Sequence, residues 1–151
     1  MKLSEILTPE TVRIPLASST KEDVLRELVG LLPSSANETM RDVLLAAVIE
    51  RESRMSTGIG QGIAIPHGKS DQVPAMEIVF GIAPTPIDFD ALDGNLSRFI
   101  FLLVSPKDAA TSHVQALATM ARLLKQESVQ DDLLRAGTPA EVEQILIKAK
   151  T

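Results

Sequence analysis

The sequence predicts an α/β fold, in which a mixed sheet carries helices on both faces within a single domain spanning residues 1–151. Residues 99–104 form an unbroken apolar run, which is typical of a strand buried on both faces. Amphipathic helical patterns lie both before and after this run, so helices are available to cover each face. With 151 residues, 44% of them hydrophobic, the chain can form one domain with a substantial core.

The amino-terminal part is predicted to contain a short helix, an edge strand and a longer helix. Residues 3–7 fit one helical turn, and residues 12–16 fit an edge strand because a proline interrupts them. A capping-box pattern at residues 19–22 begins the longer helix, and Gly30 and Pro33 end it.

A second amphipathic helix is predicted to follow directly. Ser35 and Glu38 repeat the capping signature, and apolar residues recur at helical spacing through residues 40–48. This helix leads into Arg51, so it delivers that side chain to the segment that follows.

The middle of the chain reads as strands and turns. Residues 61–66 fit a short strand, residues 68–74 a loop and residues 76–83 a longer strand. Residues 87–89, next to a proline, fit a brief edge strand, and residues 91–95 a turn around Asp-Gly. The buried run at residues 99–104 follows as the central strand.

Three helices are predicted after the central strand. Thr111 or Ser112 is suited to cap the first, whose apolar residues keep the helical period, and Ser128 to cap the second. The third begins at Thr138, with Pro139 at its first helical position.

Composition excludes several classes of function. The net charge of −5 gives no electrostatic support for nucleic-acid binding, but an acidic body suits a basic protein partner. The absence of cysteine excludes disulfides and thiolate chemistry, and the presence of only four Phe without Trp or Tyr argues against aromatic platforms for stacking bases or sugars. No segment approaches the roughly 20 apolar residues of a membrane span or resembles a signal peptide, so we expect a cytoplasmic protein.

The segment around residues 58–68 is the strongest candidate site. Gly58, Gly60 and Gly62 alternate ahead of a short apolar run that ends in Pro66 and His67. Glycines permit unusual backbone angles or close approach, and the residue before a proline is held extended. His67, one of only two histidines, is therefore expected at a stiff, defined position.

Three other side chains can join His67. His113 lies just inside a predicted helix start, where amide N–H groups and the helix dipole attract anions. Arg51 and Arg54 offer guanidinium groups that match phosphate oxygens. Taken singly, either arginine is as readily explained by an exposed ion pair with a neighbouring glutamate, and His113 by a solvated helix terminus. Together with His67 they suit phosphoryl transfer through an imidazole nitrogen, which requires no metal or other cofactor.

These residues carry a family resemblance. The segment 56–68, Ser-Thr-Gly-Ile-Gly-Gln-Gly-Ile-Ala-Ile-Pro-His-Gly, resembles the phosphorylation-site signature of phosphotransferase system enzyme IIA, type 2, the fructose/mannitol and nitrogen-regulatory class. Residues 86–89, 93–94, 100–103 and 113–117 continue the family pattern in order. The resemblance covers nearly the whole chain and implies a mixed sheet of roughly five strands with flanking helices.

The resemblance also implies roles. His67 would accept a phosphoryl group on Nε2 from the histidine-containing phosphocarrier protein, while His113 and Arg51 contact that group; Arg54 has no counterpart. The acceptor would be enzyme IIB or a regulated protein, without nucleic acid or membrane insertion. A supporting loop would comprise Ser56, Thr57, Gly60, Gly62, Pro66 and Gly68.

Three functional classes remain open at this stage. A phosphocarrier of the nitrogen-regulatory type is favoured, because the chain shows no carrier domain or membrane span, but a separate fructose-type transport subunit fits as well. A binding module of the same fold that is never phosphorylated is a second class, although it should lack His67. A metal-dependent enzyme using both histidines is a third, but no suitably spaced carboxylate accompanies them.

Overall fold

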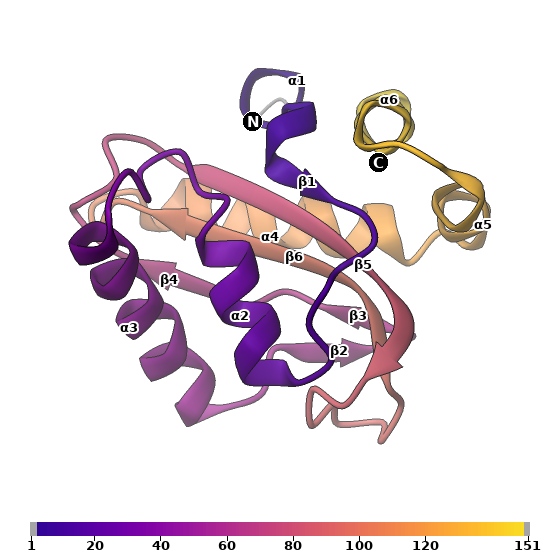
Figure 1. The fold of residues 1–151 in the computed structure, drawn as a ribbon, viewed down its shortest axis with the longest axis horizontal. Helices are drawn as coiled ribbons and strands as arrows, with labels where there is room; N and C mark the ends of the chain where they lie inside the picture. Colours follow the sequence, from indigo (N-terminus) through magenta and orange to yellow (C-terminus); the bar gives the residue numbers. More distant parts are fainter. Residues whose placement is uncertain (1–2, 150–151) are drawn as a thin grey trace.

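A computed structural model describes residues 3–149, and its centre is one mixed six-stranded sheet. The strand order is β1-β5-β6-β3-β2, and β4 also pairs with β6 (Figure 1). The predicted mixed sheet is confirmed, with one strand more than the roughly five expected. The strands are β1 (Val12–Arg13), β2 (Gly58–Gly60), β3 (Ile63–Ala64), β4 (His67–Lys69), β5 (Glu77–Ile87) and β6 (Ser97–Ser105).

The central strand β6 pairs antiparallel with β5 on one side and parallel with β3 and then β4 on the other. Ile63 pairs with Phe99 and His67 with Leu103, so the offset is the same in both ladders and β4 continues β3 in register. The amide of Leu103 bridges the two ladders by donating to the Pro66 carbonyl, at 3.1 Å. His67 is thus fixed beside the central strand β6.

Two strand predictions were wrong. The loop predicted for residues 68–74 begins later, because Gly68 and Lys69 pair with β6 as part of β4. The separate strand predicted at residues 87–89 does not form, since β5 extends to Ile87, which pairs with Ser97 after a register shift that follows Ile82.

Helices cover both faces of the sheet, as predicted. Alternate residues of β6 point to opposite faces: Phe99, Phe101 and Leu103 join one buried cluster, and their even-numbered neighbours join the other. The first cluster is covered by α1 (Leu3–Ile6), α4 (Ala110–Leu124), α5 (Glu127–Arg135) and α6 (Pro139–Lys148), and the second by α2 (Lys21–Val29) and α3 (Glu38–Arg54).

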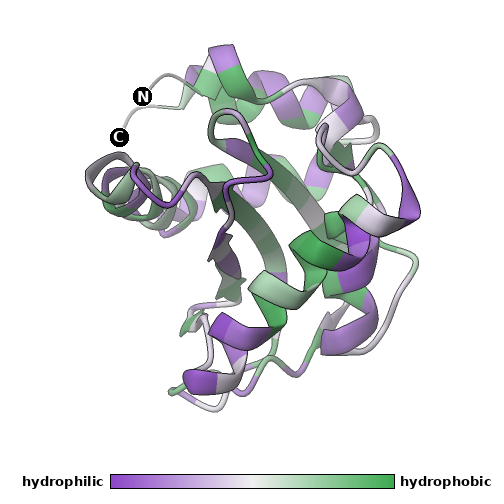
Figure 2. Ribbon diagram, turned by 90° about the vertical axis from the view of Figure 1, so that its left-hand side faces the viewer, coloured by the Kyte–Doolittle hydropathy of each residue, from purple (hydrophilic) through white to green (hydrophobic). Residues whose placement is uncertain are grey.

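The helices are amphipathic: green and purple residues alternate along them in Figure 2. A 3-10 turn, η1 (Pro9–Thr11), leads into β1. Within residues 3–149, no helix combines the length and apolar character needed to cross a bilayer. The two buried clusters lie on opposite faces of one sheet. The prediction of a single domain over residues 1–151 also includes residues outside the described range, so it stays a prediction.

The helix starts agree with prediction at one of five positions. Thr138 caps α6 through its side chain, as predicted, whereas α2 is capped by Thr20, one residue after the Ser19 that begins the predicted capping box. Asn37, rather than Ser35, caps α3 by accepting from the Met40 amide, and Ser35 instead donates to a backbone carbonyl. Neither α4 nor α5 has a side-chain cap, and both begin two or three residues earlier than predicted.

Gly68 allows α3 to lie directly against β4. A Cβ atom at Gly68 would lie 3.2 Å from the carbonyl carbon of Ala47 and from the amide nitrogen of Val48, both in the backbone of α3. Arg51 stands one helical turn beyond Ala47, so this close approach also sets its distance from His67.

Replacing Gly68 with alanine should therefore lower the free energy of unfolding by about 1–3 kcal/mol, because a helix backbone cannot yield as a side chain can. Urea denaturation measures the change. Gly137→Ala is the matched control, since a Cβ at Gly137 would meet no atom of residues 3–149 within 4 Å, and its φ is not positive; that variant should be neutral or slightly more stable. Equal stability of the two variants would contradict the packing argument.

Candidate functional site

His67 is half-buried at the start of β4. Its Nδ1 lies 2.9 Å from the carbonyl oxygen of Ile65. A carbonyl can only accept a hydrogen bond, so Nδ1 carries the proton and Nε2 holds the free electron pair when the ring is neutral. Burial lowers the pKa of His67, the Ile65 bond opposes that change, and the charge of Arg51 adds to the lowering. The ring is therefore an uncharged nucleophile near pH 7.

His113, the fourth residue of α4, lies beside His67. The two ring centroids are 5.2 Å apart, and the ring planes meet at 66°. Only 3% of His113 is exposed, which argues against a solvated helix terminus. Its Nδ1 lies 2.5 Å from the hydroxyl oxygen of Ser105, the last residue of β6. Burial, followed by the charges of His67, Lys69 and Arg51, lowers the pKa of His113 to about 4.

The two arginines differ in their surroundings. Arg54 is paired with Glu50, at 2.5 Å from Nη2 to Oε1, so the exposed helix-end ion pair accounts for it. Arg51 donates to the carbonyl of Met55 at 3.0 Å, and its charge acts on both imidazoles. The structure thus places His113 against His67 and Arg51 near enough for its charge to act on both rings, whereas Arg54 is paired with Glu50.

Two charged residues near His67 were missed in the sequence. Lys69, on β4, follows His67 at the two-residue spacing that puts side chains on one face of a strand, and its charge lowers the pKa of both histidines. Glu52 is buried, and its charge opposes the lowering of the His67 pKa. The local sequence pattern predicts a loop at Lys69. Only the pairing of β4 with β6 shows that Lys69 lies on a strand with His67.

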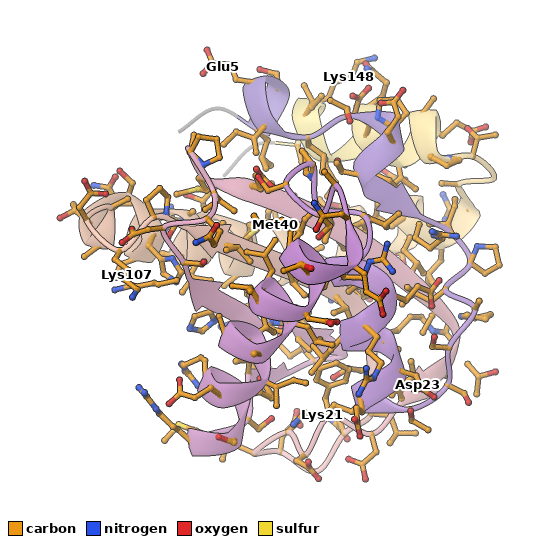
Figure 3. All side chains as sticks on the ribbon, turned by 60° about the vertical axis from the view of Figure 1, so that its left-hand side comes forward. Glu5, Lys21, Asp23, Met40, Lys107 and Lys148 are labelled. Atoms are coloured by element: carbon orange, nitrogen blue, oxygen red, sulfur yellow. The ribbon has the colours of Figure 1, made fainter. Side chains whose placement is uncertain are left out.

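Glu52 also holds the start of the glycine-rich segment. Its carboxylate accepts from the amide of Thr57 at 3.1 Å and from the Thr57 hydroxyl at 2.6 Å. Lys21 of α2 pairs with the same carboxylate at 2.7 Å. Figure 3 shows Lys21 on the side of the carboxyl-terminal end of α3, the end away from Met40. The end of α3, which carries Arg51, is therefore tied to the segment that leads to His67.

The other residues of the predicted supporting loop have structural partners. Ser56 donates to the backbone after β5, and Gly62 and Pro66 offer carbonyls to amides of β6. Gly60 has a φ of +87°, and a Cβ there would lie 2.5 Å from the carboxylate of Asp93. These contacts hold the backbone of the segment that leads to His67.

The arrangement has the parts needed to move a phosphoryl group. A neutral imidazole nitrogen supplies the electron pair, while a second imidazole and nearby cations can stabilise negative charge on phosphoryl oxygens. Within residues 3–149, no three His, Cys, Asp or Glu side chains cluster closely enough to hold a metal ion.

A family model described as "Phosphoenolpyruvate-dependent sugar phosphotransferase system, EIIA 2" matches residues 5–149. The chain belongs to this enzyme IIA family. The resemblance inferred from the segment around His67 is thereby confirmed over residues 5–149. The family carries out phosphotransfer as part of the phosphotransferase system, which agrees with the chemistry that the site allows.

Relatives of this enzyme IIA chain include a fructose-specific component and nitrogen regulatory proteins. It is 34% identical over 146 residues to the fructose-specific EIIABC component of Bacillus subtilis (strain 168), covering 97% of this chain but only 23% of that relative. It is 33% identical over 144 residues to a nitrogen regulatory protein of Bradyrhizobium diazoefficiens, covering 93% and 91% of the two chains. The crystal structure of nitrogen regulatory protein IIA-Ntr from Neisseria meningitidis superposes with a TM-score of 0.87 and 31% identity, over 95% of this chain and 98% of that one. The α/β fold is that of enzyme IIA.

Proposed function

We propose that this enzyme IIA is a cytoplasmic phosphocarrier in which His67 accepts a phosphoryl group from the histidine-containing phosphocarrier protein. It then passes the group to enzyme IIB or uses it as a signal to a regulated protein. The observation that carries the proposal is the 2.9 Å bond from His67 Nδ1 to the Ile65 carbonyl, which leaves Nε2 as the nucleophile beside His113 and Arg51.

The proposed step is a single in-line displacement. Nε2 of His67 attacks the phosphorus of the donor phosphohistidine, a new N–P bond forms, and the donor N–P bond breaks with its electron pair returning to the donor ring. The proton on His67 Nδ1 keeps its hydrogen bond to the Ile65 carbonyl throughout. Arg51 and His113 stabilise the negative charge on the equatorial oxygens.

Reconstitution tests this proposal. The chain is incubated with phosphoenolpyruvate, enzyme I and the phosphocarrier protein, and the phosphate is then located by mass spectrometry. We expect one acid-labile, base-stable phosphate on the peptide that contains His67. No incorporation, or an acid-stable phosphate ester, would contradict the proposal and favour a binding module that shares the fold without being phosphorylated.

We further propose that the chain is of the nitrogen-regulatory type. The support is the similarity to nitrogen regulatory proteins, among them the IIA-Ntr structure with a TM-score of 0.87. A fructose-type transport subunit is the second candidate, because identity to the fructose-specific relative is as high. Phosphorylated chain mixed with a fructose-specific enzyme IIB separates the two: rapid transfer of the phosphate would favour transport.

Arg51 is expected to stabilise the transition state. Arg51→Ala should slow phosphorylation of His67 by about 10²-fold, the effect typical of losing one preorganised donor. Rapid-quench assays of phosphate incorporation measure the rate. Arg54→Ala is the matched control, since Arg54 leaves the same helix but pairs with Glu50; its rate should stay that of the unmodified chain. Equal slowing in both variants would assign the effect to general positive charge.

A further inference from the structure

Ser105 is a buried polar residue that the proposed phosphoryl transfer has not yet explained. It ends β6 and is 0% exposed. It pairs with Lys69 in the ladder between β4 and β6, and therefore stands beside the strand that carries His67. Its hydroxyl oxygen lies 2.5 Å from Nδ1 of His113.

The direction of this hydrogen bond follows from what the hydroxyl can reach. Within residues 3–149, the His113 ring is the single hydrogen-bond partner of the Ser105 side chain. If Nδ1 of His113 donated to the hydroxyl, the buried O–H of Ser105 would have no acceptor, at a cost of about 1–3 kcal/mol. If the hydroxyl donates to Nδ1, its O–H is satisfied and only oxygen lone pairs stay unused.

The same direction gives His113 a defined tautomer. The ring is neutral near pH 7, because burial and nearby positive charge hold the pKa of His113 at about 4. With Nδ1 accepting from Ser105, the one ring proton resides on Nε2. The two imidazoles of the site then have opposite tautomers: His67 carries its proton on Nδ1 and His113 on Nε2.

We propose that Ser105 is a positioning residue that holds His113 as the Nε2–H tautomer, so that His113 donates a hydrogen bond to the phosphoryl group transferred to His67. The opposite tautomer would turn a lone pair toward anionic oxygens and repel them. The inference rests on the proposed function, because it requires phosphoryl transfer at His67.

Nitrogen NMR of the imidazole rings tests the tautomer without any phosphate. At pH 7 the unmodified chain should show a protonated Nε2 and an unprotonated, hydrogen-bonded Nδ1 for His113. Ser105→Ala should shift these signals toward a mixture of tautomers. A protonated Nδ1 in the unmodified chain would overturn the inference, even if His67 is phosphorylated normally. Absence of phosphate on the unmodified chain would instead contradict the proposed function.

Transfer rates test the consequence with a matched pair. Thr and Val have nearly equal volumes, but only Thr keeps a hydroxyl, so Ser105→Thr and Ser105→Val disturb packing alike. Phosphorylation of Ser105→Val should be slower than that of Ser105→Thr by about 10-fold, less than for a deleted donor because the ring is still present. Equal rates in the two variants would mean that the Ser105 hydroxyl does not position His113 for transfer and that Ser105 has a structural role alone.

Discussion

Replacing His67 with alanine is expected to abolish incorporation of phosphate from phosphoenolpyruvate, enzyme I and the phosphocarrier protein. No other side chain of the site offers a nitrogen with a free electron pair in the same place: the guanidinium of Arg51 only donates hydrogen bonds, and Nδ1 of buried His113 is engaged with Ser105. The measurement is the amount of acid-labile phosphate per chain after exhaustive reaction.

The variant should fold, because His67 is only half-buried and its side chain is held by the bond to the Ile65 carbonyl. Loss of such a bond costs about 1 kcal/mol. His113→Ala is the informative comparison, since it keeps the nucleophile and removes only a stabilising group. It should still acquire phosphate, at a rate lowered by about 10²-fold. Persistent labelling of His67→Ala would mean that another residue accepts the phosphate.

Much of the fold could be predicted from the sequence, because local patterns report burial directly. The apolar run at residues 99–104 identified β6, whose two sides face the two buried clusters. The glycine segment and Pro66 predicted a fixed backbone position for His67. The helical spacing of apolar residues through 40–48 predicted that Arg51 lies at the end of a helix leading to it. These inferences need only the period of helix and strand and the backbone properties of glycine and proline.

Other parts of the site depend on strand register, which local patterns do not encode. Lys69 and Ser105 are 36 positions apart and meet only because β4 pairs with β6. Gly68 was interpreted as the start of a loop, whereas its missing side chain makes room for the backbone of α3. The burial of Glu52 depends on Thr57 and on Lys21 from a different helix. Such long-range pairings become visible only in three dimensions.

The proposal for His113 also predicts how stability responds to mild acid. The pKa of His113 in the folded chain is about 4, below the ordinary value of 6.5 that applies on unfolding. Above pH 6.5 both states are neutral, and stability is at its full value. As pH falls below 6.5, His113 binds a proton in the unfolded chain but not in the folded chain. The free energy of unfolding therefore decreases until pH reaches about 4.

The expected loss from His113 is about 1.5 kcal/mol between pH 6.5 and pH 5, measured by urea denaturation at each pH. His67 adds to the loss, because its pKa is also lowered. The carboxylates with lowered pKa, Glu27 and Asp93, lose their contribution to stability mainly below pH 4.5 and therefore lie outside this window.

His113→Gln should flatten the curve of unfolding free energy against pH, and the double variant with His67→Gln should flatten it further, because the chain has only two histidines. An unmodified chain equally stable at both pH values would mean that His113 becomes protonated while folded, and a cationic His113 could not keep the acceptor nitrogen that Ser105 requires.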